Sequence, residues 1–405
     1  MKICFNDMLY SFSYALDCVE HELVGVTTYH SKRIAYLSIQ LGKYFDLTVE
    51  EQLDLAACAA LHDNALTEYI EDEYGKGNAS KESKKELIIG KHCLLGERNI
   101  KKLPFFKDVK GAILFHHECA DGSGPFMKKT SETPLYARII HLADQVDAMF
   151  DLSVVTDEKL QKIVSFLKQE EDKLFDRDSV NAFLQNVTPQ TLIKMENGQI
   201  ENVLFEELPY MERDYTPEEL IHFSSLYANI VDYKSEFTKE HSLGIAKKCL
   251  TMAKYYGYDE EKQAKLYFAG AVHDIGKLVV EHDILEKPDK LTEDEYEHIK
   301  THAYYTYQML HKIKGLEEIT RWASCHHEKL NGKGYPFGKT KDQLGKEERL
   351  MACLDIYQAL SEERPYKKGM SHERSIQILQ KMVNRKELDG NIVNDINLVF
   401  QSEKS

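Results

Sequence analysis

Histidines and aspartates with the spacing of metal ligands are concentrated in the C-terminal half of the chain. His273-Asp274 and His326-His327 lie in one short stretch, and His302 falls between them in a run with helical periodicity. Imidazole and carboxylate groups together suit first-row transition metals, and the two oxygens of a carboxylate can bridge two ions. Two ions about 3.5–4 Å apart can hold an attacking hydroxide and polarise a phosphoryl oxygen. The pattern therefore predicts a metal-dependent site that hydrolyses phosphate esters.

The same residue types recur in the N-terminal half at a nearly constant distance. His62 precedes His273 by 211 positions, and His116 precedes His326 by 210 positions. A single histidine on an apolar helix face is more often a packed core residue than a ligand, but paired positions in two copies argue against that interpretation. The paired residues are His30, His62, Asp63, His92, His116, His117 and Asp144 in the first copy, and His241, His273, Asp274, His302, His326, His327 and Asp355 in the second.

The elements that must position these residues are predicted to be helices. Hydrophobic residues recur with a period near 3.6 along most of the chain, and few segments resemble strands. Helix starts are predicted at the capping box Thr48-Val-Glu-Glu51 and at Thr216-Pro217-Glu218-Glu219. The span from Asn186 to Glu212 is the least regular. The sequence therefore predicts an all-α fold with tandem domains at 1–185 and 215–405, joined by a linker at 186–214.

Composition narrows the classes of partner and compartment. The chain has 405 residues and a formal net charge of −15, which argues against a nucleic-acid polymer as the main partner. No apolar run approaches the roughly 18–20 residues that cross a bilayer, and Met1–Tyr10 does not resemble a signal peptide. The eight scattered cysteines form no C-x-x-C pair and indicate free thiols. We therefore expect a cytoplasmic protein that does not bind a membrane. A homodimer and a signalling partner protein both stay open.

The second copy resembles a known enzyme family. The set His241, His273-Asp274 and Asp355 resembles the HD phosphohydrolase superfamily. The additional histidines, with the motifs His273-Asp-Ile-Gly-Lys277 and Asn331-Gly-Lys-Gly-Tyr-Pro336, resemble its HD-GYP branch. The resemblance is close over about residues 225–400 and looser over 15–185. It implies two HD-type helical bundles, each around a His/Asp metal site, and hydrolysis of a 3′,3′-cyclic dinucleotide, either cyclic di-GMP or cyclic GMP-AMP.

The resemblance also implies roles for individual residues of the second copy. One metal would be bound by His241, His273, Asp274 and Asp355, and the second by Asp274, His302, His326 and His327, with Asp274 as the bridge. A metal-bound hydroxide would be the nucleophile, and Asp274 and Lys277 would be the catalytic side chains. Substrate would be bound by Lys277 at the scissile phosphate, by Tyr335 beside the site, and by Arg364 and Lys367 on the phosphates.

Two positions depart from the family pattern. Asn331 stands where the family usually has Asp, which puts the hydrogen bonding of this loop in doubt. Members with a third metal carry Glu four residues before the first His, where this chain has Phe237. We therefore expect two divalent ions per site, iron or manganese. The sequence leaves open which of these metals is bound and whether either site holds a third ion.

The first copy keeps all seven ligand types but not the residues that would bind the substrate. Leu66 stands in place of Lys277, Gly124-Pro125-Phe126 replaces Gly-Tyr-Pro, and no Arg-Pro-Tyr-Lys motif follows Asp144. Loss of one group that stabilises the transition state costs about 10²–10³-fold in rate. We therefore expect the second domain to be catalytic. The first would be weakly active, act on another substrate, regulate its partner, or use metal only to stabilise its fold.

Other functions remain compatible with the sequence. A nucleotidase or another phosphomonoesterase is an alternative within the superfamily, although many such HD proteins do not need His302, His326 and His327. A non-catalytic, metal-stabilised signalling module would be natural if ligands were missing, and none is. A di-iron oxygenase is disfavoured because Lys277 and the Arg-Pro-Tyr-Lys motif suit phosphates. The choice between cyclic di-GMP and cyclic GMP-AMP is not fixed by the sequence.

Overall fold

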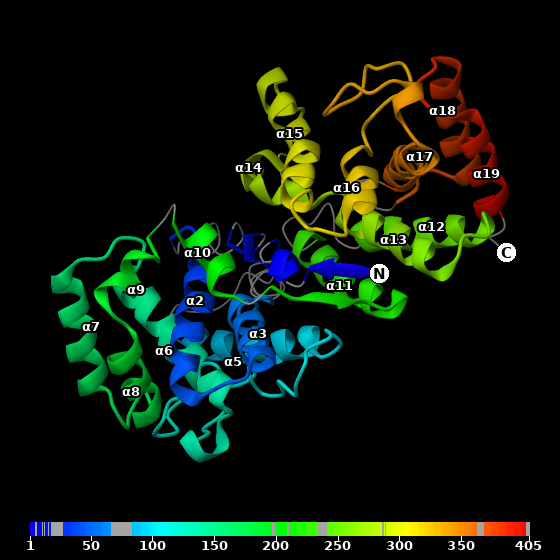
Figure 1. The fold of residues 1–405 in the computed structure, drawn as a ribbon. Helices are drawn as coiled ribbons and strands as arrows, with labels where there is room; N and C mark the ends of the chain where they lie inside the picture. The colour runs from blue at the N-terminus through cyan, green and yellow to red at the C-terminus, as the bar shows by residue number, and fades with distance from the viewer. Residues whose placement is uncertain are drawn as a thin grey trace. The chain divides into compact units, whose positions relative to one another are not determined.

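The chain divides into two compact units (Figure 1). The N-terminal unit is Phe5–Glu212, and the C-terminal unit is Arg213–Ser405 together with Met1–Cys4. The computed structural model describes residues 1–401 except 5, 10, 12, 15, 18–26, 66–82, 197–198, 209, 233–240, 286, 288 and 363–367. Within the described residues both units are helical, with a single two-stranded sheet formed by β1 (Lys2–Cys4) and β2 (Glu212–Asp214). The predicted all-α fold is confirmed.

The N-terminal unit is built around α2 (His30–Gly42), all of whose residues are buried. This helix packs against α3, α6, α8 and α10, which surround it and leave no face of it in water. Thr48 caps α3 through the reciprocal bonds with Glu51, which confirms the predicted capping box. The described helices are α2, α3 (Val49–Ala60), α5 (Ser83–Ile100), α6 (Leu135–Phe150), α7 (Asp157–Gln169), α8 (Arg177–Asn186), α9 (Pro189–Ile193) and α10 (Ile200–Glu207), with short 3₁₀ turns at Lys43–Phe45 and Thr130–Glu132.

The C-terminal unit is organised around α13 (Glu260–Val272), which packs against α11, α12 and α16. Thr216 and Glu219 exchange cap hydrogen bonds, so α11 begins where the sequence predicted. The other helices are α11 (Pro217–Asp232), α12 (His241–Tyr255), α14 (His282–Leu285), α15 (Glu293–Leu310), α16 (Glu317–Ser324), α17 (Lys346–Ser361), α18 (His372–Asn384) and α19 (Gly390–Phe400), with 3₁₀ turns at Ile275–Val279 and Lys341–Gln343.

The structure differs from the expected domain boundaries in two places. Part of the expected linker is helical, because Ile200, Leu204 and Leu208 recur at helical spacing and are buried as α10 packs on α2. Pro189 does not interrupt a helix but begins α9, where its missing N–H costs nothing. The first residues of the chain belong to the C-terminal unit, where the amide of Cys4 donates to Lys314.

No helix among the described residues is both long and apolar enough to cross a bilayer.

Candidate metal centres

Each unit brings its seven predicted ligands together from helices and turns. His30 and His241 are the first residues of α2 and α12. The His-Asp pairs lie just after the ends of α3 and α13, and the His-His pairs lie in turns. The remaining ligands are carried by helices: His92 on α5, Asp144 on α6, His302 on α15 and Asp355 on α17.

The carboxylate of Asp274 presents its two oxygens to two different groups of histidines. Its Oδ2 lies 3.2 Å from Nε2 of His273 and 3.8 Å from Nε2 of His241. Its Oδ1 lies 3.3 Å from Nε2 of His302 and 3.7 Å from Nε2 of His326. Two ligands that share an ion at bonds of about 2.0–2.2 Å stand roughly 3–3.5 Å apart. Each oxygen therefore faces its own pair of histidines, which is the placement that a carboxylate shared by two ions would need.

The carboxylate of Asp355 also lies near both groups of histidines. One of its oxygens lies 3.7 Å from Nε2 of His241, and the other lies 3.4 Å from Nδ1 of His327. Within the second group, Nε2 of His302 and Nε2 of His326 are 3.1 Å apart. All these side chains are buried except His327, which is partly exposed. The open edge of the site therefore lies beside His327.

The N-terminal unit repeats this arrangement. Oδ2 of Asp63 lies 3.6 Å from Nε2 of His62, and Oδ1 lies 3.3 Å from Nε2 of His92 and 3.7 Å from Nε2 of His116. Asp144 is placed in the same way as Asp355. Its Oδ1 lies 3.4 Å from Nε2 of His30, and its Oδ2 lies 3.9 Å from Nδ1 of His117. The two units therefore hold ligand sets of the same design.

Backbone carbonyls fix the tautomer of five of these histidines. In each case the oxygen lies three residues before the ring, and because a carbonyl only accepts, Nδ1 must carry the proton. The Nε2 lone pair is then left to face the site, as it does in metal-ligating histidines. The Nδ1–oxygen distances are 2.9 Å for His62, 2.6 Å for His116, 2.7 Å for His273, 2.6 Å for His302 and 2.6 Å for His326.

Carboxylates orient His30 and His241, and these carboxylates come from different positions in the two copies. Nδ1 of His30 lies 2.6 Å from Asp147, whereas Nδ1 of His241 lies 2.9 Å from Glu362. The residue 211 positions after Asp147 is Gln358, which donates to Glu362 at 2.7 Å. The sequence analysis missed both carboxylates, and the repeat spacing gives no signal for them.

We expect Glu362→Ala to weaken metal binding by the C-terminal unit about 10- to 100-fold, because an outer carboxylate raises the basicity of the histidine that it orients. Competition with a chelator of known affinity measures the change. Glu297→Ala is the control, since Glu297 is 63% exposed and pairs only with the surface residue Lys300 among the described side chains. Equal affinities of the two variants would contradict this role for Glu362.

The donors fit a divalent metal. Nε2 of His62, Oδ1 of Asp63, Nε2 of His273 and Oδ1 of Asp274 are buried and make no hydrogen bond to any described group. A buried polar group without a partner costs about 1–3 kcal/mol, and an ion between these atoms would remove that cost. Mixed imidazole and carboxylate donors suit borderline transition metals.

Burial and neighbouring charges keep the C-terminal ligands in the forms that bind metal. Burial alone would raise the pKa of the Asp274 carboxyl, but His273 and Lys277 outweigh it and hold the pKa well below its ordinary value. Burial lowers the pKa of His302 to about 3, although Asp274 acts in the opposite direction. The carboxylate is therefore ionised and the imidazole neutral near neutral pH.

Of the predicted substrate residues, two lie at the C-terminal site. Nζ of Lys277 lies 2.5 Å from Oδ2 of Asp274 and is partly exposed. The ring of Tyr335 lies 4.7 Å from the ring of His327, at the open edge of the site. Arg364 and Lys367 fall outside the described residues, as do Leu66 and Phe237.

A glutamate braces the loop after each His-His pair, and the sequence analysis gave it no role. Glu328 accepts from the amides of Phe337 at 2.7 Å and Lys339 at 2.9 Å. Glu118 accepts from the amides of Phe126 and Lys128 in the first copy. Both follow the His-His pair directly, 210 positions apart, so the repeat itself carried the signal. The brace holds Tyr335 beside the histidines.

A glycine lets each His-Asp turn approach the helix that carries the next histidine. A Cβ on Gly276 would stand 1.9 Å from the carbonyl oxygen of His302 and 2.6 Å from the amide of Thr306. In the N-terminal unit Ala65 occupies this position, and the glycine is on the helix instead. A Cβ on that residue, Gly96, would stand 3.2 Å from the side chain of Asn64 in the turn.

We expect Gly276→Ala to destabilise the C-terminal unit by about 3 kcal/mol or more, at the upper end for overpacking, because its methyl group meets backbone atoms. Denaturant unfolding measures the change. Gly96→Ala is the matched variant and should cost less, since the nearest atoms, at 2.9 Å and 3.2 Å, belong to side chains that can move. An equal cost would contradict the close approach in the C-terminal unit.

Comparisons with known proteins agree with this geometry. A model of the HD domain matches residues 19–178 and 225–392. The 3′3′-cGAMP-specific phosphodiesterase 1 of Vibrio cholerae is 30% identical over 391 residues, which cover 93% of this chain and 89% of that protein. A cyclic di-GMP phosphodiesterase of Pseudomonas aeruginosa is 32% identical over 142 residues, 35% of this chain and 34% of that protein. A crystal structure of a V. cholerae cyclic GMP-AMP phosphodiesterase, V-cGAP3, superposes over 99% of both chains with a TM-score of 0.67 at 23% identity.

The two matched ranges cover most of the chain, and the superposition shows the same fold. The protein belongs to the HD-domain family, in its HD-GYP branch, and this family uses divalent metals. The resemblance stated from the motifs is confirmed.

Proposed function

We propose that this protein is a metal-dependent phosphodiesterase that hydrolyses a 3′,3′-cyclic dinucleotide in its C-terminal unit. The observation that carries the proposal is the placement of Asp274 between two groups of histidines, with Lys277 beside it. Its relative aligned over 93% of the chain is named for cyclic GMP-AMP. Cyclic GMP-AMP is therefore the first substrate to test, and cyclic di-GMP is the second.

Two divalent ions in the C-terminal site, iron or manganese, would supply Lewis acidity and an activated water at the phosphate. One ion would be held by His241, His273, Asp274 and Asp355, and the other by Asp274, His302, His326 and His327. Neutral imidazoles leave the site with net positive charge, which favours a phosphodiester.

The remaining residues of the C-terminal site bind and orient the substrate. Lys277 places a cation beside Asp274, where it would neutralise charge that develops on the scissile phosphate. Tyr335 presents an aromatic ring at the open edge beside His327, where a nucleobase or ribose could pack. Arg364 and Lys367 would bind the phosphates of the substrate.

We assign an accessory or regulatory role to the N-terminal unit. It keeps the metal ligands, but Pro125 stands at the position of Tyr335 and Leu66 at that of Lys277. Without those groups it would stabilise a phosphodiester transition state poorly. We also infer a cytoplasmic location, supported by the free thiols of the described cysteines: Cys4, Cys58, Cys93, Cys119, Cys249, Cys325 and Cys353.

The test is metal analysis of anaerobically purified protein, with turnover of both dinucleotides followed by chromatography. The double variant His273→Ala/Asp274→Ala is the control. We expect about two ions per C-terminal site and hydrolysis that disappears in the control. Metal without cleavage of either dinucleotide would overturn the proposal. Release of phosphate from a nucleoside monophosphate would then identify a phosphomonoesterase, and its absence would identify a metal-stabilised binding module.

A further inference from the structure

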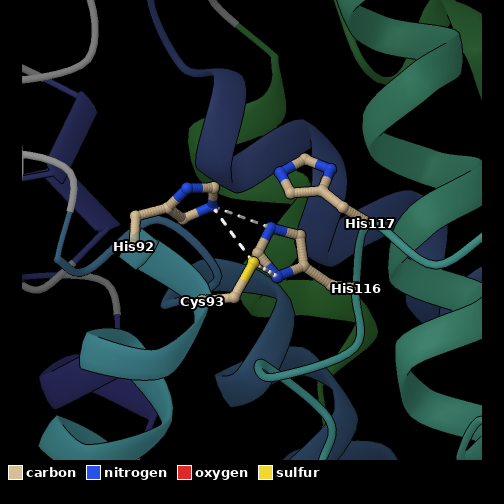
Figure 2. A group of neighbouring side chains, drawn as sticks. All are labelled: His92, Cys93, His116 and His117. Atoms are coloured by element: carbon tan, nitrogen blue, oxygen red, sulfur yellow. Dashed lines mark hydrogen bonds between the residues drawn. The ribbon is translucent and has the colours of Figure 1, made fainter. Parts of the chain in front are cut away.

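A cysteine lies among the histidines of the N-terminal centre. Cys93 follows His92 on α5, and its side chain is fully buried. Its Sγ lies 3.6 Å from Nε2 of His92 and 3.8 Å from Nδ1 of His116, the ring nitrogen that donates to the carbonyl of Ile113. Figure 2 shows the sulfur beside the rings of His92 and His116, with His117 next to His116. The sequence analysis counted this residue only as one of the free thiols.

The spacing of these donors is that of ligands around one ion. With bonds of about 2.05 Å to nitrogen and 2.3 Å to sulfur, a tetrahedral site has edges of roughly 3.3 Å between nitrogens and 3.6 Å between nitrogen and sulfur. The edge from His92 to His116 is 3.4 Å, and the edge from His92 to Cys93 is 3.6 Å. One donor atom from each of His92, Cys93, His116 and His117 lies within 4.8 Å of the others.

A second, independent observation points into the same group. Oδ1 of Asp63 faces His92 at 3.3 Å and His116 at 3.7 Å. That oxygen is buried and makes no hydrogen bond to any described group. A fully buried histidine on the same turn, His62, also has an Nε2 without a hydrogen-bond partner among the described residues. A metal ion in the cluster would supply a partner for both of these buried atoms.

The second copy has no sulfur at this place. The residue after His302 is Ala303, which is fully buried on α15. The otherwise matching centres therefore differ by one donor. Alanine in the second copy also shows that this packing position accepts a methyl group, so a thiol is not required there for volume.

We propose that Cys93 is a thiolate ligand of the ion bound by His92, His116 and His117. The inference rests on the proposed binding of metal by the N-terminal unit. The thiol gives up its proton as the sulfur–metal bond forms. Thiolate donors favour Zn²⁺ over Mn²⁺, so the two centres of one chain would select different metals. The added negative charge also lowers the attraction of the N-terminal centre for phosphates.

The test uses the full chain, stripped of metal by a chelator and then titrated with Co²⁺. A cobalt–thiolate bond gives a charge-transfer absorption in the near ultraviolet, and imidazole and carboxylate ligands give none. We expect this band in the unmodified protein and its loss in Cys93→Ala. We expect it to persist in Cys325→Ala, which removes a buried thiol of the C-terminal unit, and to double in intensity in Ala303→Cys.

Equilibrium dialysis of the same samples distinguishes thiolate ligation by Cys93 from metal binding by the N-terminal unit as a whole. We expect Cys93→Ala to keep its C-terminal ions and to bind Zn²⁺ in the N-terminal unit at least about 10- to 100-fold more weakly, the loss that is typical even for outer-shell residues. Co²⁺ bound by the N-terminal unit without the band would overturn thiolate ligation alone. If the double variant His92→Ala/His116→Ala binds as many metal ions per chain as the unmodified protein, the N-terminal unit does not bind metal through these residues. That result would overturn the inference as well.

Discussion

Asp274→Asn is expected to lower cyclic-dinucleotide turnover by more than about 10³-fold. Loss of one preorganised charge-stabilising group costs about 10²–10³-fold, and this substitution removes the shared ligand of both proposed ions. Asparagine keeps the shape of the side chain but turns one oxygen that faces the histidines into an amide nitrogen, which donates and does not bind metal. Initial rates at saturating metal, with chromatography of the products, measure the change.

Asp63→Asn is the matched variant in the N-terminal unit, because Asp63 faces its histidines as Asp274 does. It should retain more than half of the turnover while losing metal from its own site. A loss of more than half, with an unchanged unfolding transition of the C-terminal unit, would contradict the assignment of hydrolysis to that unit. Metal analysis of both variants shows from which centre each variant has lost its metal.

Lys277→Met is expected to lower kcat by about 10²–10³-fold without lowering the metal content. The flexible apolar side chain of methionine retains much of the length of lysine and removes only the cation beside Asp274. Steady-state kinetics with metal analysis on the same samples test this expectation. Lys287→Met is the control, since Lys287 forms its ion pair with Glu295, 2.7 Å away and outside the site.

A purely structural role for Lys277 would give a different result. If the lysine only balanced the charge of Asp274, the variant would have a changed affinity for metal and would recover full kcat at saturating metal. The two roles are therefore separated by the metal dependence of the rate. A normal kcat in Lys277→Met would remove this residue from the proposed mechanism.

The residues that cluster at the candidate metal centres could be predicted from the sequence because they form a repeated pattern. His62 and His273, or His116 and His326, are matched by type and by distance along the chain, and the family motifs name the same positions. The all-α fold followed from helical periodicity. Glu118 and Glu328 were visible in the same repeat, but only the structure shows that they accept from the amides of the following loop.

Other parts of the site depend on contacts that spacing does not encode. Asp147 and Glu362 both orient a histidine, but they reach it from different turns, so aligning the copies pairs Asp147 with Gln358. Cys93 joins the candidate site because its side chain points toward His92. The positions of the cysteines along the sequence do not reveal that direction. The segment 186–214 was expected to be a linker because it holds Pro189, Gly198 and Pro209. The burial of Leu204 on α2 determines its structure instead.

The different positions of the glycine in the two His-Asp turns bear on how a duplicated gene can evolve. Genetic exchange that copied the Asn64-Ala65 turn onto the second half would place an alanine methyl group against the carbonyl of His302. Such a recombinant would lose stability in its C-terminal half before any change in chemistry was tested. The turn of one half therefore cannot replace the turn of the other without loss of stability. This loss opposes sequence homogenisation between the two halves at this turn. Each half is left to diverge along its own course.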